Sequence, residues 1–117
     1  MTKQLGNAGE ELVKQYLKQQ GFVILEQNYA KFYGEIDIIA RNKDTICFVE
    51  VKTRRSNKVS LHYSITKAKQ NKIIAVAQSY IANKGRNNLT YRFDVALIYM
   101  NNNIPELTYI PNAFCAE

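Results

Sequence analysis

Two short apolar stretches joined by a polar turn constrain the fold of this chain more than any other feature. Residues 35–40 and 45–52 are rich in Ile, Val and Phe, and residues 41–44 between them are polar. The pattern predicts an antiparallel β-hairpin whose turn is centred on Asn42 and Lys43. Each stretch also carries acidic side chains, so the hairpin is a candidate site as well as part of a core.

The acidic residues of this hairpin are expected to lie close together. Side chains alternate between the two faces of a strand, so Glu35 and Asp37 are predicted to share a face with Ile39, and Glu50 to share one with Lys52. An even-length turn places these two sets on the same side of the sheet. Asp37 then lies opposite or diagonal to Glu50, within the ~4.5–8 Å typical of cross-strand neighbours.

Facing carboxylates need compensation, because like charges on neighbouring strands repel. A bound Mg²⁺ or Mn²⁺ would supply it, since such ions take one or two carboxylates together with water and phosphate oxygens. Lys52 is placed to hold an attacking water or to stabilise charge on a phosphorus. The alternative is a solvated strand face in which Glu50 and Lys52 form a surface pair of little energetic value. The residue pattern alone leaves both interpretations open.

Four ordered motifs resemble a known family. They are Gly34-Glu35-Ile36-Asp37, Phe48-Val49-Glu50-Val51-Lys52-Thr53-Arg54, Lys69-Gln70-Asn71-Lys72-Ile73 and Arg92-Phe93-Asp94-Val95. Asp37 followed by Glu50-Val51-Lys52 is similar to the core of the PD-(D/E)xK nuclease superfamily. Together the motifs resemble the bacterial YraN-like family of predicted endonucleases, which is similar to archaeal Holliday-junction resolvases. The likeness runs from about Gly9 to Phe114, with two departures: Ile36 replaces the Pro of the superfamily pattern, and Leu61-His62-Tyr63 stands where the family more often has Gly.

The resemblance implies metal-dependent hydrolysis of phosphodiesters in DNA, including branched or structured DNA. Asp37, Glu50 and the Val51 carbonyl would hold Mg²⁺ or Mn²⁺, and Lys52 would orient the attacking water. The resemblance also implies supporting catalytic roles for one residue on each predicted helix. These residues are Glu10 and Gln70.

Glu10 borders the apolar stripe of a helix predicted over residues 7–20, with Gly21 as its left-handed cap. From that position its carboxylate can reach a site built on the sheet. The alternative is a capping box, in which Glu10 bonds back to the Asn7 N–H at the start of the helix.

Basic residues follow the predicted site at two places in the sequence. Arg54 and Arg55 follow the second hairpin strand and are placed to clamp phosphate oxygens. Lys69 and Lys72 lie on the apolar side of a helix predicted over residues 64–84 with Ser64 as its N-cap, where the helix dipole disfavours cations. Solvated surface charge, or lysine stems packed on the sheet, is the alternative. His62 has no evident partner and is interpreted as a loop residue.

Three aromatic residues lie beside Lys31 just before the hairpin: Tyr29, Phe32 and Tyr33. Packing over the core is the favoured interpretation, and stacking on unpaired bases is the alternative. Further along the chain, Arg92 and Asp94 share a strand face and are expected to pair with each other in a structural role.

The order of the predicted elements indicates an α/β fold in a single domain, residues 1–117. Strands over residues 22–26, 35–40, 45–52, 91–100 and 104–110 form a mixed central sheet of about five strands flanked by helices, as in the restriction-endonuclease-like core that the resemblance implies. Pro105 places the last strand at an edge.

Composition supports a nucleic-acid partner but does not require one. Sixteen Lys and Arg against ten Asp and Glu leave a net charge of +6. With no signal peptide or membrane span in the pattern, a cytoplasmic protein is expected, and the two Cys indicate neither zinc nor a disulfide. DNA is the expected partner, and a homodimer stays open. The alternative functions are a DNA-binding module without turnover and a structural protein with a basic partner.

Overall fold

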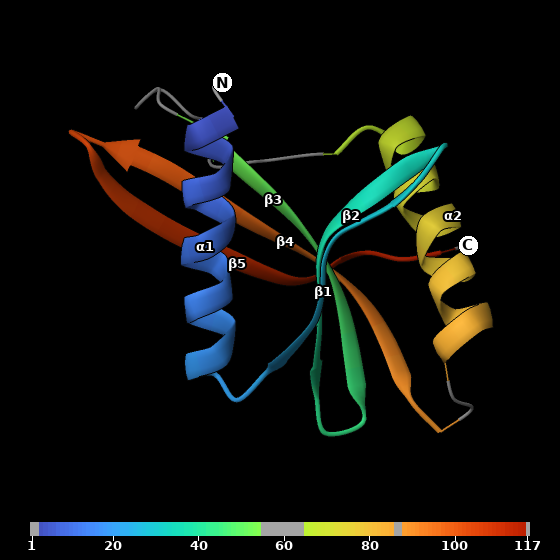
Figure 1. The fold of residues 1–117 in the computed structure, drawn as a ribbon. Helices are drawn as coiled ribbons and strands as arrows, with labels where there is room; N and C mark the ends of the chain where they lie inside the picture. The colour runs from blue at the N-terminus through green and yellow to red at the C-terminus, as the bar shows by residue number, and fades with distance from the viewer. Residues whose placement is uncertain (1–2, 55–64, 86–87, 117) are drawn as a thin grey trace.

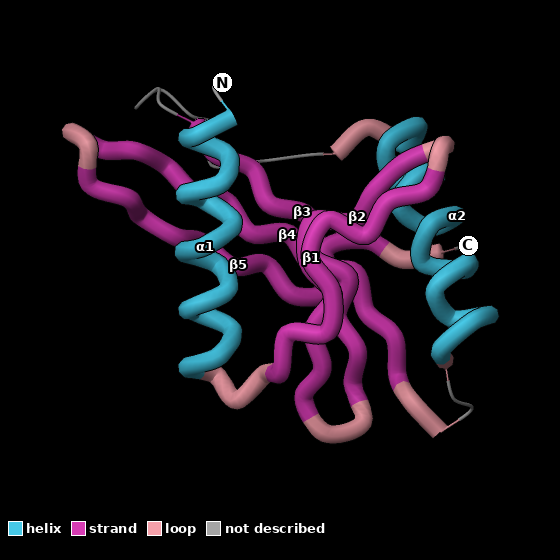
Figure 2. The backbone as a smooth tube through the Cα atoms, viewed as in Figure 1, coloured by secondary structure: helices cyan, strands magenta, loops and turns pink. Residues whose placement is uncertain are grey.

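The computed structural model describes residues 3–54, 65–85 and 88–116, in which two helices lie on opposite faces of a five-stranded sheet (Figure 1). The elements in chain order are α1 (Lys3–Gln19), β1 (Val23–Lys31), β2 (Gly34–Asn42), β3 (Thr45–Arg54), α2 (Lys67–Lys84), β4 (Thr90–Asn101) and β5 (Ile104–Phe114). The strands are ordered β1-β2-β3-β4-β5, as Figure 2 allows the reader to follow, with β3 and β4 parallel and the other pairs antiparallel. The predicted mixed α/β sheet is confirmed.

The first helix begins earlier than its sequence pattern predicts. It starts at Lys3, so Asn7 lies inside the helix and its N–H is part of the helical ladder. The capping box of Asn7 and Glu10 is therefore wrong. Gly21 has φ +92°, the left-handed conformation predicted for it, which ends the helix without a Cβ penalty.

The second helix begins later than predicted. Thr66 is its N-cap, and the Thr66 side-chain oxygen accepts the Lys69 N–H at 3.2 Å. The predicted cap, Ser64, lies outside the described residues. This start places Lys67 and Lys69 in the first turn of α2, close to the end of the helix where unpaired N–H groups concentrate positive potential.

Each face of the sheet has its own apolar cluster. Under α2, residues of the helix pack on β2, β3 and β4; the buried members are Ile36, Ile39, Ile46, Phe48, Ile73, Val76, Ala77, Tyr80 and Phe93. Under α1, the buried members are Val13, Leu17, Ile38, Ala40, Cys47, Val49, Ala96 and Ile98. Burying each large aliphatic side chain is worth about 1.5–3 kcal/mol. The two clusters together anchor both helices.

The hairpin turn lies one residue later than predicted. Asn42 pairs with Thr45, so Lys43 and Asp44 form a two-residue turn, and Lys43 takes a left-handed φ of 54°. Moving the centre of the turn by one residue shifts each cross-strand partner by two positions. Because side chains alternate with period two, the same faces of the two strands still lie on one side of the sheet. Ile39 consequently faces Phe48, and the apolar residues of both strands still meet on the same side.

Strand β2 contributes residues to both apolar clusters. Ile36 belongs to the α2 cluster, whereas Ile38 belongs to the α1 cluster. Pairing with β3 ends at Ile38, and before that residue β2 pairs with β1 alone, in the part of the hairpin that Figure 1 shows beside the start of α2. The β1–β2 register has no shift between Glu35 and Ile39, so this change of cluster reflects the stronger twist of a two-stranded ribbon. The prediction that Glu35, Asp37 and Ile39 share one face stays a prediction.

A buried carboxylate joins β4 to the edge strand β5. Asp94 is fully buried and accepts from Arg92 Nε at 2.9 Å and Nη2 at 3.0 Å, from the Tyr109 hydroxyl at 2.5 Å and from the Asn112 N–H at 2.9 Å. The predicted Arg92–Asp94 pair is confirmed, and its buried charge is fully hydrogen-bonded. Pro105 lies on the edge strand β5, as predicted.

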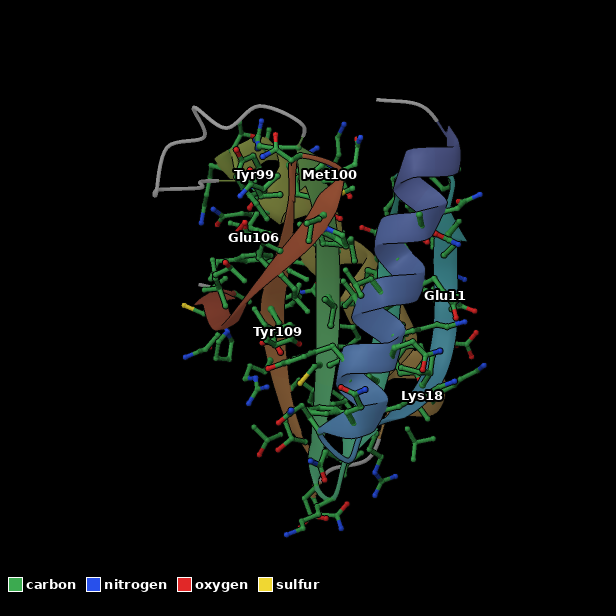
Figure 3. The ribbon with its side chains drawn as sticks, turned by 90° about the vertical axis from the view of Figure 1, so that its left-hand side faces the viewer. Glu11, Lys18, Tyr99, Met100, Glu106 and Tyr109 are labelled. Carbon is green, nitrogen blue, oxygen red and sulfur yellow. The ribbon has the colours of Figure 1, made fainter. Side chains whose placement is uncertain are left out.

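Helix α1 crosses the face of the sheet formed by the central strands and β5. Figure 3 shows the helix in front of the sheet, with Glu11 and Lys18 on the side of α1 away from Tyr109. Tyr109 packs instead on Tyr16 of α1, with ring centroids 5.3 Å apart. Within the part of the chain that the structure describes, no helix has the length and apolar content needed to cross a bilayer.

Candidate active site

A cavity of about 530 Å³ opens where four segments distant in the sequence meet. Gly6 and Glu10 come from the first turns of α1, and Thr66 to Ile73 contribute from the start of α2. The beginning of β2 and the end of β3 form the rest of the wall, at the upper end of the sheet in Figure 1. Both helices thus direct their N-terminal ends toward the cavity, an arrangement that favours anionic groups there.

The lining of this cavity is mainly charged. Four side chains are acidic, namely Glu10, Glu35, Asp37 and Glu50, and three are basic, namely Lys52, Lys69 and Lys72. Val51 lies in the wall between Glu50 and Lys52. Ten residues were predicted to act in catalysis, metal binding or DNA binding. The structure brings seven of them together in this cavity, namely Glu10, Asp37, Glu50, Val51, Lys52, Lys69 and Lys72.

Asp37 and Glu50 are the innermost acidic pair. Asp37 directly precedes Ile38 and Glu50 directly follows Val49, and Ile38–Val49 is the last pair of the β2–β3 ladder. Asp37 Oδ2 accepts the Val51 N–H at 2.8 Å, which holds the carboxyl in the plane of the sheet. Glu50 is only 6% exposed, so a carboxylate there has little access to water.

The pKa of Asp37 is raised to about 8. Burial is the largest cause, followed by hydrogen bonding with Glu50 and by the Glu50 charge, while the Val51 N–H opposes the rise. At neutral pH, without a bound cation, a pKa of about 8 leaves Asp37 mostly protonated. A pair of carboxyl groups that cannot both ionise easily is a binding site for positive charge.

Lys69 supplies part of that positive charge. Its ammonium lies 2.7 Å from Glu50 Oε2, across the cavity from Asp37, and its side chain is 46% exposed. The ion pair compensates a carboxylate that would otherwise be buried uncompensated. Lys69 was predicted to contact DNA from the helix start, and its pairing with Glu50 was not anticipated, because no local pattern links a residue of β3 to one of α2.

Glu10 reaches the cavity because α1 approaches β3 closely. A Cβ at Gly9 would overlap Thr53 Oγ1 of β3, so only glycine allows this approach. Burial raises the pKa of Glu10, and the charges of Glu35 and Glu50 raise it further, against a hydrogen bond from Asn28 that lowers it. Asn28 was missed by the sequence analysis, although an asparagine within an apolar strand, here at φ 50°, is a usable signal.

Two described residues of the predicted site, Gln70 and Arg54, are not part of the cavity wall. Gln70 Nε2 donates to the Ile65 carbonyl at 2.9 Å and thereby ties the first turns of α2 to the segment before it. Arg54 is exposed at the end of β3, beyond the lining residues. Arg55 and His62 lie outside the described residues.

Tyr29, Phe32 and Tyr33 were predicted either to pack over the core or to stack on unpaired bases. Tyr29 packs edge-on against Tyr80 with ring centroids 5.3 Å apart, and Tyr33 also packs on the α2 cluster. For these two residues the core interpretation is confirmed. Phe32 is fully exposed at the turn between β1 and β2, so for it the core interpretation is wrong.

The residues of the cavity fit a hydrated divalent ion better than a dehydrated one. Among the described residues no group of three His, Cys, Asp or Glu side chains is arranged to hold a metal. Asp37 and Glu50 do form a two-carboxylate set with a backbone segment, Val51, beside them. Mg²⁺ commonly binds through one or two carboxylates and keeps water or phosphate oxygens as its other ligands.

Comparison with known proteins gives two consistent results. The profile of the Uncharacterised protein family UPF0102 matches residues 9–98. A UPF0102 protein from Caldicellulosiruptor saccharolyticus is 44% identical over 115 residues, covering 96% of this chain and 98% of the relative. A UPF0102 protein from Clostridium acetobutylicum is 43% identical over 117 residues, covering 97% and 96% of the two chains.

Among solved structures, the chain is similar to Hjc, a Holliday junction resolvase from Archaeoglobus fulgidus. The TM-score is 0.58 at 19% sequence identity, and the match covers 87% of this chain and 72% of the resolvase chain. At this identity the likeness shows a shared fold. The mixed sheet and the two helices described above are therefore the α/β arrangement also found in that resolvase.

Proposed function

The chain belongs to the uncharacterised protein family UPF0102, and we propose that it is a metal-dependent endonuclease that hydrolyses phosphodiester bonds in DNA, with branched or structured DNA as the preferred class. The family resemblance of the four motifs is confirmed by the match. The observation that carries the proposal is the Asp37–Glu50 pair, two carboxyl groups that line one open cavity together with Lys52. The likeness to Hjc supports it at the level of the fold.

Each residue of the inner site has a distinct proposed role. Asp37, Glu50 and the Val51 carbonyl would hold Mg²⁺ or Mn²⁺, which when bound supplies a Lewis acid that stabilises negative charge on the phosphate oxygens. Lys52 positions the attacking water, because its side chain lines the same cavity from the same strand as Glu50. Glu10 supports the site from α1, and Gln70 acts as a positioning residue through its bond to Ile65.

Binding of the DNA backbone is assigned to positive groups around the cavity. Lys72 lines it from α2, and Arg54 with Arg55 follows β3 on the adjacent side. Lys69 can leave Glu50 for a phosphate oxygen once a cation compensates the carboxylates. The N-terminal ends of α1 and α2 add backbone N–H groups that favour a phosphate.

A second function follows from the Lys69–Glu50 ion pair. With Glu50 already compensated by an ammonium group at 2.7 Å, the cavity can bind DNA through its lysines without any metal. The chain would then be a nucleic-acid-binding module with a nuclease fold and no turnover. The two functions differ in whether a divalent ion binds at Asp37 and Glu50.

Thermal unfolding with added metal tests the proposed ion site. At about ten times its dissociation constant, Mg²⁺ or Mn²⁺ should stabilise the folded protein by roughly 1.4 kcal/mol, which corresponds to a rise of about 5 °C in Tm for a domain of this size. Asp37→Asn should abolish the rise, because it removes a ligand without changing the shape of the side chain. Glu106→Gln, on the edge strand β5 and not among the residues that line the cavity, is the matched control and should keep it. An unchanged Tm for the wild-type protein at millimolar metal would contradict the ion site.

The raised pKa of Asp37 predicts how stability varies with pH in the absence of metal. The folded state holds the proton up to about pH 8, whereas the unfolded chain releases it near the ordinary value of 3.8. The contribution of the Asp37 proton to the free energy of unfolding is therefore complete below about pH 4 and is lost as pH rises toward 8. Urea unfolding between pH 5 and 9 should show this decline in wild type and a flatter profile in Asp37→Asn.

The proton held by Asp37 also predicts how the metal-induced rise in Tm depends on pH. Metal binding needs the ionised carboxyl pair, so the metal-induced rise in Tm should be larger near pH 8.5 than near pH 6. Should the rise be the same at both pH values, Asp37 would not be the group that exchanges a proton for the metal.

A further inference from the structure

Phe32 is the most exposed large apolar side chain among the described residues. It is 101% exposed, compared with 63% for Val23 and 66% for Ile104. Leaving a phenylalanine in water forgoes the roughly 1.5–3 kcal/mol that burial would contribute. Single exposed apolar residues are common on protein surfaces, so the inference depends on what surrounds Phe32.

The turn that carries Phe32 is supported by the two residues that follow it. Its ring meets the Tyr33 ring edge to face, with centroids 4.9 Å apart, and Tyr33 itself packs on the α2 cluster. At the next position, a Cβ on Gly34 would lie 3.4 Å from Lys72 Cβ and 3.4 Å from Val76 Cγ2, so β2 begins in contact with α2. Phe32 is therefore an exposed aromatic ring on a supported turn.

The turn that carries Phe32 adjoins the cavity. Gly34 and Glu35, the residues that follow it after Tyr33, are part of the cavity wall. Lys31 precedes it, with the ammonium 5.4 Å from the centre of the Tyr29 ring, and Lys72 lies on the neighbouring turn of α2. An exposed aromatic ring among cations, at the rim of a cavity suited to a phosphodiester, is the combination by which proteins bind single-stranded nucleic acid.

We propose that Phe32 stacks on an unpaired base of the nucleic acid whose phosphodiester enters the cavity. A continuous duplex hides the faces of its bases, so the ring can stack only where a strand is unpaired, as at a flap or a fork. The protein would accordingly prefer DNA with unpaired bases next to the bond that it engages. This inference rests on the proposed function for the ligand of the cavity, but it does not require turnover.

Binding without metal tests the contact separately from cleavage. In EDTA, the dissociation constants of wild type and Phe32→Ala are measured by fluorescence anisotropy for a flap DNA and for a duplex of equal length. Phe32→Ala should weaken flap binding about tenfold, in keeping with the loss of one stacked base, and leave duplex binding unchanged. Phe32→Trp should restore flap binding. A 2-aminopurine placed in the unpaired strand should be quenched by wild type and Phe32→Trp but not by Phe32→Ala.

Ile104→Ala is the matched control, because Ile104 is an exposed apolar residue at a different hairpin turn, between β4 and β5. It should bind both DNAs as wild type does. Equal losses on flap and duplex, an equal loss in Ile104→Ala, or no loss in Phe32→Ala would each overturn the proposal. If the preference for flap DNA depends on Phe32 while neither wild type nor any variant cleaves DNA with metal, the enzyme proposal fails and the stacking proposal stands. If metal-dependent cleavage occurs but Phe32→Ala binds flap DNA as wild type does, the stacking proposal fails and the enzyme proposal stands.

Discussion

Lys52→Ala is expected to lower the rate of metal-dependent DNA cleavage by about 100- to 10,000-fold, the range for removing a group that acts in proton transfer or on developing charge. Both carboxyl groups of the Asp37–Glu50 pair stay in place, so the variant should retain the metal-induced rise in Tm. It should also retain most of its DNA affinity, because the loss is confined to the transition state. Cleavage of linear, flap and four-way-junction DNA with and without Mg²⁺ or Mn²⁺ measures the effect.

Two further variants show whether the loss of cleavage is specific to Lys52. Lys72→Ala removes the same charge from the same cavity on the α2 side, and should weaken DNA binding with little change in kcat. Asp37→Asn, purified in the same way as wild type, should lose both cleavage and the thermal shift. Cleavage that persists equally in wild type, Lys52→Ala and Asp37→Asn would be contaminating activity, and the DNA-binding module would then be the better description.

Replacing Arg54, Arg55 and Lys72 together by Ala should lower DNA affinity roughly 100-fold at physiological salt, because each phosphate contact releases a condensed counterion. The slope of log K against log salt should flatten by about 2.7, or about 0.9 for each of three contacts. Lys69 is left in place, since its removal would also leave Glu50 without its ion-pair partner. Anisotropy titrations at several salt concentrations measure both quantities.

A second triple variant separates local contacts from net charge. Lys18, Lys43 and Lys84 lie at the end of α1, in the β2–β3 turn and at the end of α2, which Figure 1 shows at the opposite end of both helices from the cavity. Their replacement by Ala removes the same number of charges and should change the slope little. A slope that falls equally in both variants would mean that the overall charge of +6, and not this face, attracts the DNA.

The order and type of the elements could be predicted from the sequence because each depends on neighbouring residues. The apolar, β-branched composition of residues 45–52, the helical spacing before Gly21 and the Pro in the last strand are local signals, and β3, α1 and β5 correspond to them. Boundaries were less accurate: α1 begins at Lys3 and α2 at Lys67, since a cap is chosen by packing as well as by sequence. The packing of Ile36 and Ile38 in different clusters was not predictable, because it arises where pairing of β2 with β3 stops.

The candidate site shows the same division. Local sequence patterns were enough to identify the chemical groups of the hairpin: Asp37 and Glu50 on neighbouring strands, with Lys52 beside them. The packing of the helices brings Glu10 and Lys69 to the same cavity, directs Gln70 to Ile65 instead, and leaves Phe32 exposed to water. Alternation and turn length set which residues of one hairpin face each other, whereas contacts between elements depend on how two helices pack on opposite faces of a twisted sheet.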